Sequence, residues 1–232
     1  MSVNPSSSAG FRPGGSLAGA TRSSQSPESL GLLALRLRGD LQAADGQGRA
    51  VMVVGADDDA ASLEATLELA WCLAQELGHS VLLVDGAFGE TGMGEALGLA
   101  GESGLTHFLD APAGDLIDLA QLEQPTAHAR IFVLAQGQSG GAQTLRVEGL
   151  QRLMGQARQR HEFVLVRSSL QVDVNRSLAF SAEVDAALLL AVEEQTTWDQ
   201  IARGQRLLNE CGARRVALVL ADSRPPQRPG RG

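Results

Sequence analysis

The chain contains 232 residues, a length that suits one compact domain with a substantial core and one or two tails. Its formal net charge of -8 argues against a general affinity for nucleic acid or anionic lipid. No apolar run approaches the length of a membrane span and no secretory signal opens the chain, so we expect a cytoplasmic protein.

The two ends of the chain differ in composition from its centre. Residues 1–26 are rich in Ser, Gly, Ala and Pro and lack apolar periodicity, which predicts a disordered arm. A helix-start signal, Ser-Pro-Glu-Ser, then precedes leucines at spacings of three and four over residues 30–41, which predicts a helix docked outside the main sheet. Residues 223–232 are basic and proline-rich, and we expect them to be unstructured. A single α/β domain is therefore predicted over residues 27–222.

Between these ends, short apolar strands alternate with helical patterns. The predicted strands are apolar runs at 51–54, 81–85, 131–135, 163–167, 186–192 and 215–221. The predicted helices lie at 62–77, 94–98, 104–109, 115–122, 145–160, 175–181 and 196–211. This alternation predicts a doubly wound α/β fold, with a mostly parallel sheet and helices on both faces.

The connector between the strand at 51–54 and its helix carries three aspartates, Asp57, Asp58 and Asp59. A strand, a tight turn and a helix N-terminus usually bind a nucleotide in such folds, because backbone N–H groups and the helix dipole favour an anion. A phosphate-binding loop also needs glycines, a lysine and a magnesium-binding hydroxyl. The connector offers no lysine, and its carboxylates would repel a triphosphate. We interpret it as a solvated loop that caps the helix; a cation site is the alternative.

The order of elements and several motifs over residues 26–222 resemble the cytoplasmic domain of bacterial tyrosine kinases. These kinases belong, with the MinD and ParA proteins, to the deviant-Walker group of P-loop NTPases. The segment Glu68-Leu69-Ala70 holds the place of the family's Asn-Leu-Ala, which aligns residues 61–64 with the Gly-Lys-Ser-Thr of the phosphate loop. Those positions are Ala61, Ser62, Leu63 and Glu64, so the phosphate lysine and the magnesium hydroxyl are missing.

The other nucleotide-binding motifs of the family are altered as well. Asp85 matches the first aspartate of Asp-x-Asp-x-Arg, but Ala87 and Gly89 replace the other two residues. Arg167 stands at the Walker B carboxylate, a charge reversal that works against metal binding. Ala221 replaces the family's adenine-contacting Asn. We interpret Asp85 as a polar residue that ends a strand; a relic of the catalytic aspartate is the alternative.

These losses predict that the chain has no catalytic, cofactor-binding or metal-binding residue and takes no cofactor. Phosphoryl transfer depends on positioned cations around the phosphates. The family's kinases phosphorylate tyrosines in their own C-terminal tail, and this chain has no tyrosine. The two cysteines, Cys72 and Cys211, fall within helical patterns without metal-ligand spacing, so we expect both to be buried thiols.

The resemblance implies a catalytically inactive, tyrosine-kinase-like protein that acts as an interaction or regulatory subunit in exopolysaccharide synthesis or export. Its partner would be a membrane polysaccharide co-polymerase or an ATP-competent paralogue, through which it would reach the membrane. The family's ring-forming motif Glu-x-x-Arg-x-x-Arg is not kept, because Leu32 and Leu35 precede Arg38, so homo-oligomerisation is left open. The alternative is a MinD/ParA-like ATPase with a non-standard phosphate loop. A weaker alternative is a MinD-like positioning factor.

Overall fold

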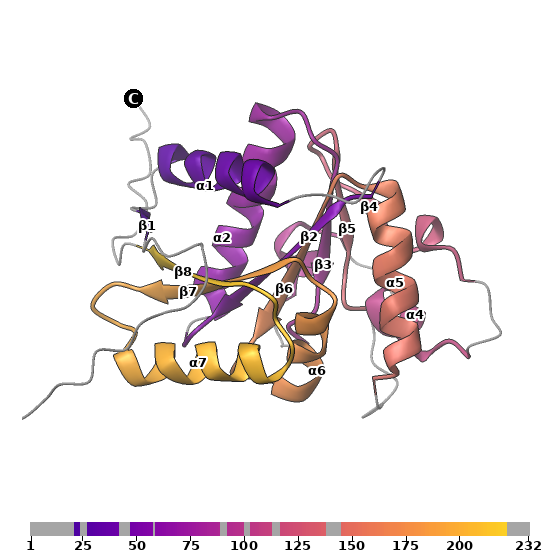
Figure 1. Ribbon diagram of the computed structural model, residues 1–232. Coiled ribbons are helices and arrows are strands. Elements are labelled where there is room, and N and C mark those ends of the chain that lie inside the picture. The colour runs from indigo at the N-terminus through magenta and orange to yellow at the C-terminus, as the bar shows by residue number, and fades with distance from the viewer. Residues whose placement is uncertain are drawn as a thin grey trace, which may run out of the picture.

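The computed structural model describes residues 21–23, 27–41, 47–57, 59–88, 92–99, 103–112, 117–137 and 145–221. Within these ranges the strands form one sheet in the order β1-β8-β7-β2-β6-β3-β5-β4 (Figure 1). The strands are β1 (Thr21–Ser23), β2 (Arg49–Gly55), β3 (Val81–Asp85), β4 (Gln124–Pro125), β5 (Ile131–Leu134), β6 (Phe163–Ser169), β7 (Ala186–Val192) and β8 (Val216–Ala221). All neighbouring strands are parallel except β4, which runs antiparallel to β5.

Helices cover both faces of the sheet. They are α1 (Pro27–Asp40), α2 (Asp59–Trp71) with its π-helical continuation η1 (Cys72–Glu76), α3 (Met93–Ala96), α4 (Leu105–Asp110), α5 (Val147–Arg160), α6 (Val174–Leu178) and α7 (Trp198–Glu210). Two single turns, η2 (Leu119–Gln121) and η3 (Ala179–Ala182), are 3₁₀-helical. No helix in the described ranges combines the length and the hydrophobicity that a membrane span requires.

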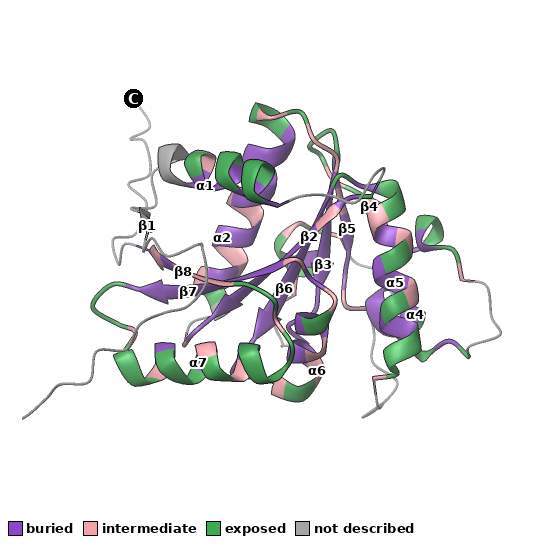
Figure 2. Ribbon diagram, in the orientation of Figure 1, coloured by how far each residue is buried: buried purple, intermediate pink, exposed green. Residues whose placement is uncertain are grey.

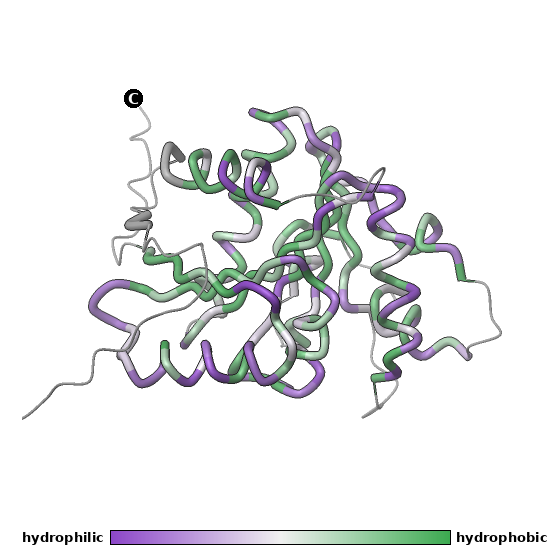
Figure 3. Tube along the Cα trace, in the orientation of Figure 1, coloured by the Kyte–Doolittle hydropathy of each residue, from purple (hydrophilic) through white to green (hydrophobic). Residues whose placement is uncertain are grey.

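The core consists of two apolar clusters, one on each face of the sheet. Met52 and Val54 of β2 belong to the cluster that α4, α5, α6 and α7 complete. Val51 and Val53 belong to the opposite cluster, with α1 and α2. Successive side chains of a strand point to opposite faces, so a strand that is buried on both must be apolar throughout. The central strands are accordingly buried (Figure 2), and the green apolar segments gather in the centre of the molecule (Figure 3).

The six predicted strands and the doubly wound fold class are confirmed. Two predictions about local structure need correction. Residues 115–122 were expected to form a helix, yet 117–118 have no regular secondary structure and only η2 is helical, while 115–116 lie outside the described residues. Thr21–Ser23 forms β1 on the outer edge of β8, inside the predicted disordered arm. The rest of that arm and residues 222–232 lie outside the described residues.

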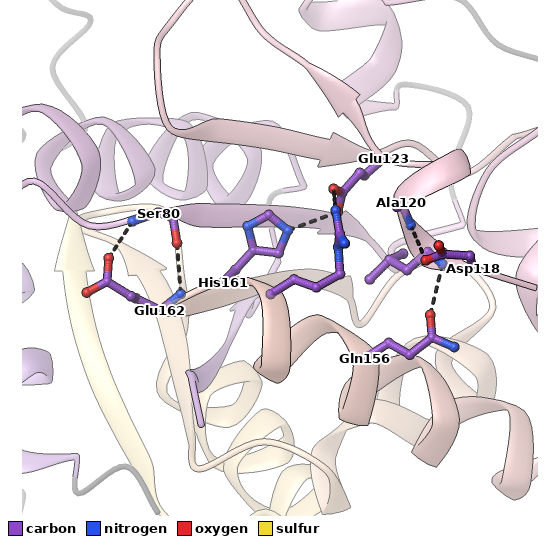
Figure 4. A network of polar contacts seen from close by, with 9 residues as sticks. Ser80, Asp118, Ala120, Glu123, Gln156, His161 and Glu162 are labelled. Atoms are coloured by element: carbon purple, nitrogen blue, oxygen red, sulfur yellow. Dashed lines mark hydrogen bonds and ion pairs between the residues drawn. The ribbon is translucent and has the colours of Figure 1, made fainter. Parts of the chain in front are cut away.

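Hydrogen bonds from distant segments explain why η2 is so short. The backbone N–H of Leu119 donates to Oε1 of Gln156 on α5, and the side-chain amide of Gln156 donates to the carbonyl of Ile117. Asp118 caps the turn by accepting from Ala120 (Figure 4). The N–H of Leu119 and the carbonyl of Ile117 are therefore bonded to α5 and not to a longer helix, which periodicity alone does not reveal.

A polar network joins β4 to the start of β6 at the amino edge of the sheet (Figure 4). Glu123 contacts both Arg160 and His161, with a distance of 2.9 Å between its Oε2 and Nε2 of His161. Burial opposes ionisation of Glu123, but hydrogen bonds from Arg160 and His161 and the charges of both residues outweigh it. The pKa of Glu123 therefore lies below its ordinary value of 4.5.

Replacing Glu123 with glutamine is expected to remove a pH-dependent part of the stability. A carboxyl group whose pKa falls on folding stabilises the protein fully above its ordinary pKa, and this contribution is lost as pH falls through the lowered pKa. At pH 7 the native chain should exceed Glu123→Gln in free energy of unfolding by about 1–3 kcal/mol. Urea titrations at descending pH should show this gap closing below 4.5. A gap that is the same at every pH, or that also appears for the exposed control Glu148→Gln, would contradict the assignment.

Candidate functional site

The carboxyl edge of the sheet is the candidate site, because ligands of doubly wound domains bind outside the carboxyl ends of the strands. The ends of β2, β6 and β3 lie side by side there, since β6 pairs with both of the others. Gly55 of β2 is in register with Ser169 of β6, and Asp85 of β3 is in register with Arg167 of β6. The strand order thus brings together the loop after β2, Asp85 at the end of β3 and Arg167 of β6, which the sequence analysis had singled out separately.

Asp85 and Arg167 form a buried ion pair at this edge. Nη1 of Arg167 lies 3.2 Å from Oδ1 of Asp85, and the two side chains are only 3% and 1% exposed, respectively. The second carboxylate oxygen of Asp85 accepts a 2.7 Å hydrogen bond from the backbone N–H of Met93, at the start of α3. Burial raises the pKa of Asp85, against the opposing effects of the Arg167 charge and of these hydrogen bonds.

Asp85 is the last residue of the parallel strand β3, as the sequence predicted, and the structure adds an ion pair to this placement. Its carboxylate has a specific cationic partner, and that partner is Arg167, which the resemblance aligns with the Walker B carboxylate. A guanidinium group brings a fixed positive charge and several donors to a carboxylate. Arg167 therefore places a positive charge beside the carboxylate of Asp85. The family resemblance aligns Asp85 with a catalytic aspartate.

Hydroxyl groups near the ion pair bond to the backbone of the loops that follow the strands. Ser168 donates to the carbonyl of Ser177, and Ser177 donates to the carbonyl of Ala87. Ser169 accepts from the backbone N–H groups of Gln171 and Val172. Ser168, Ser169 and Ser177 are all buried. These side chains tie the loops after β3 and β6 to each other and to α6.

The loop after β2 is tied to β7. The backbone N–H of Ala56 donates to the carbonyl of Leu190, and Thr196 donates a 2.7 Å hydrogen bond to Asp57. Thr196 also accepts from the N–H of Val192. Asp57 is half-buried and bonded across the edge, whereas the sequence predicted a solvated capping residue. Asp58 lies outside the described residues, as does Gly89.

The residues at the phosphate-loop positions face the protein interior to different degrees. Ser62, which aligns with the phosphate lysine, has no solvent exposure, and its carbonyl accepts from the hydroxyl of Thr66. Leu63 and Glu64 are half-buried. The lysine position is thus filled by a small, enclosed side chain.

The segment after Asp85 places a buried aromatic side chain at this edge. Ala87 is fully buried and Phe88 is 7% exposed. Phe88 has a φ of 52°, in the left-handed region that bulky residues rarely adopt. The guanidinium of Arg176 on α6 lies 4.1 Å from the centre of its ring. No pattern in the sequence indicated this pair, because a left-handed Phe and its stacked Arg come from separate segments.

The remaining candidate residues do not form a site. Cys72 is buried as predicted, and burial, with the charges of Glu76 and Glu68, raises its pKa to about 11. Cys211 is exposed, contrary to the prediction, and it caps the C-terminal end of α7, which ends at Glu210. Within the described ranges, no group of three or more His, Cys, Asp or Glu side chains could hold a metal ion.

No sequence profile of a known protein family matches the chain, and no curated protein matches it significantly. Solved structures do match. The kinase domain of the Escherichia coli tyrosine kinase ETK has a TM-score of 0.68 and 18% identity, over 89% of this chain and 80% of that domain. The chimerical protein CapA2B2 has a TM-score of 0.67 and 17% identity, over 85% of each chain.

A second group of matching structures consists of MinD and ParA ATPases. The cell division ATPase MinD of Pyrococcus furiosus has a TM-score of 0.56 and 20% identity, over 75% of this chain and 71% of that one. Both groups are those that the sequence resemblance had indicated. The chain therefore has the fold that bacterial tyrosine kinase domains share with the MinD and ParA ATPases.

Proposed function

We propose that this chain is a catalytically inactive, nucleotide-independent relative of the tyrosine-kinase-like ATPases that acts as an interaction protein. The observation that carries the proposal is the buried ion pair between Asp85 and Arg167 at the carboxyl edge of the sheet. A magnesium ion at this edge would have to displace a guanidinium group from a desolvated carboxylate. Such an exchange is costly, because both charges would lose a partner in a region of low dielectric.

The basic residues of the chain support the same proposal. All 19 of its lysine-plus-arginine residues are arginines, so the chain has no lysine at any position. A phosphate-loop lysine reaches the β- and γ-phosphates as a compact charge, and the enclosed Ser62 offers no such group. The alternative function, a MinD/ParA-like ATPase with a non-standard loop, would need its lysine from another subunit.

The proposed partner is a membrane polysaccharide co-polymerase or an ATP-competent paralogue in an exopolysaccharide system. This part of the proposal rests on the sequence resemblance and on the fold shared with bacterial tyrosine kinase domains. A packed α/β scaffold survives the loss of phosphate ligands, because its stability comes mainly from apolar burial. A binding surface on the helices can therefore persist after the nucleotide chemistry has been lost.

Isothermal titration with ATP and with ADP, each with magnesium, tests the proposal directly. We expect no binding heat and no thermal stabilisation at about 1 mM nucleotide. A site with a Kd of about 10 µM would instead raise the free energy of unfolding by about 2.7 kcal/mol at that concentration. Such stabilisation, absent when EDTA replaces magnesium, would reject nucleotide independence and favour the ATPase alternative.

A separate experiment addresses the partner. Affinity-tagged protein should retain a co-expressed membrane co-polymerase in detergent, equally with and without ATP. Failure to retain it, together with retention of an ATP-competent paralogue, would identify the second of the proposed partners. Failure to retain either would contradict the proposed role while leaving nucleotide independence to the titration.

A further inference from the structure

The turn between β7 and α7 presents acidic and aromatic side chains on a well-supported backbone. The N–H groups of Gln195 and Thr196 bond to the carbonyl of Val192, and Glu194 takes a left-handed φ of 65°. Thr197 and Gln200 then form a reciprocal capping box at the start of α7. The turn is therefore held in shape by its own hydrogen bonds, with no need of its outward side chains.

Those outward side chains are Glu193, Glu194 and Trp198. Trp198 is 78% exposed, more than any other large hydrophobic side chain in the described ranges, and both glutamates are exposed. An exposed indole within five residues of two exposed carboxylates in one turn suits a guanidinium group, which stacks on aromatic rings and pairs with carboxylates. It also suits proline, since extended proline-rich segments dock on exposed aromatic rings.

The chain itself provides such a segment at this place. The described residues end at Ala221, whose carbonyl accepts a 2.8 Å hydrogen bond from the N–H of Glu193. β7 and β8 end on the same side of the molecule, and α7 begins on that side as well (Figure 1). Residues 222–232 follow directly, and they contain three arginines and three prolines, namely Arg224, Arg228, Arg231, Pro225, Pro226 and Pro229. At roughly 3.1 Å per residue in an extended proline-rich chain, Arg224 is within about 10 Å of Ala221.

We propose that residues 224–232 bind in cis to the surface formed by Glu193, Glu194 and Trp198. A segment joined to its site by a short connection has an effective concentration on the order of millimolar. A segment with an intrinsic Kd of about 1 mM would then occupy the surface about half of the time.

Fluorescence of Trp198 in the full-length chain tests this inference. The chain has two tryptophans, so Trp71→Phe leaves Trp198 as the single emitter. In that background we compare the intact tail with Arg224→Gln/Arg228→Gln/Arg231→Gln, using the neutral quencher acrylamide. We expect the neutralised tail to raise the quenching constant by up to about two-fold, and 0.5 M salt to bring the intact chain to the same value.

Matched variants separate docking from a general charge effect. Arg38→Gln/Arg206→Gln/Arg214→Gln removes the same charge from exposed positions elsewhere and should leave quenching unchanged. Glu193→Gln/Glu194→Gln should raise quenching as the tail variant does, and combining the two sets should add little further, because they remove one interaction. Equal quenching of the intact and neutralised chains would overturn the proposal. A difference that grows with protein concentration would overturn the assignment in cis and place the tail on a second copy.

Discussion

Replacing Arg167 with alanine is expected to lower the free energy of unfolding by about 3–5 kcal/mol, because it leaves the carboxylate of Asp85 buried without its cationic partner. The loss should be smaller at pH 5 than at pH 8, since the unpaired carboxyl group takes up a proton and a neutral group is cheaper to bury. Urea unfolding followed by circular dichroism at both pH values measures the difference.

Two further variants decide whether the loss comes from the unpaired charge. The double variant Asp85→Asn/Arg167→Met removes both charges and should recover most of the stability, as apolar replacements of buried ion pairs often do. Asp173→Asn breaks the ion pair between Asp173 and Arg176, in which Asp173 is 39% exposed, and should cost less than about 1 kcal/mol. A double variant as unstable as Arg167→Ala would show that packing of the arginine, and not its charge, holds the edge together.

Restoring the phosphate-loop lysine is expected to damage the protein. Ser62→Lys places a long cationic side chain at a position with no solvent exposure, which should cost at least about 3 kcal/mol in free energy of unfolding. The same replacement at the exposed Ala60, two residues earlier in α2, should cost less than about 1 kcal/mol. In a working phosphate loop the lysine position opens toward the ligand. A stable Ser62→Lys variant that gains ATP binding would therefore contradict the conclusion that this position is enclosed.

The introduced lysine also reports its own environment. The native chain has no lysine, so the new amine is the only side-chain amine in the protein. Burial disfavours the charged form, and we expect the pKa of Lys at this position to fall well below its ordinary value of about 10.4. A proton-detected titration of the labelled lysine measures this shift, with Ala60→Lys as the control.

Much of the fold followed from local sequence patterns. The six apolar strands and their alternation with helices predicted the doubly wound class, because a strand buried on both faces must be apolar along its whole length. The missing phosphate lysine and the absence of tyrosine were likewise properties of the sequence. Each of these conclusions depends on residues that are neighbours in the chain or on composition alone.

Tertiary structure decided which side chains meet at the carboxyl edge of the sheet. The sequence placed Asp85 and Arg167 at separate strand ends, but only the strand order makes β3 and β6 neighbours in the register that pairs the two side chains. The bond from Thr196 to Asp57 and the single turn at η2 arise in the same way, from partners far away in the chain. Hydrophobic periodicity fixes which face of an element is buried, whereas the choice of polar partner depends on which segments the sheet brings together. The sequence by itself thus determined the fold class and the absence of lysine and tyrosine, while the tertiary structure determined that Asp85 and Arg167 form an internal ion pair at the carboxyl edge of the sheet.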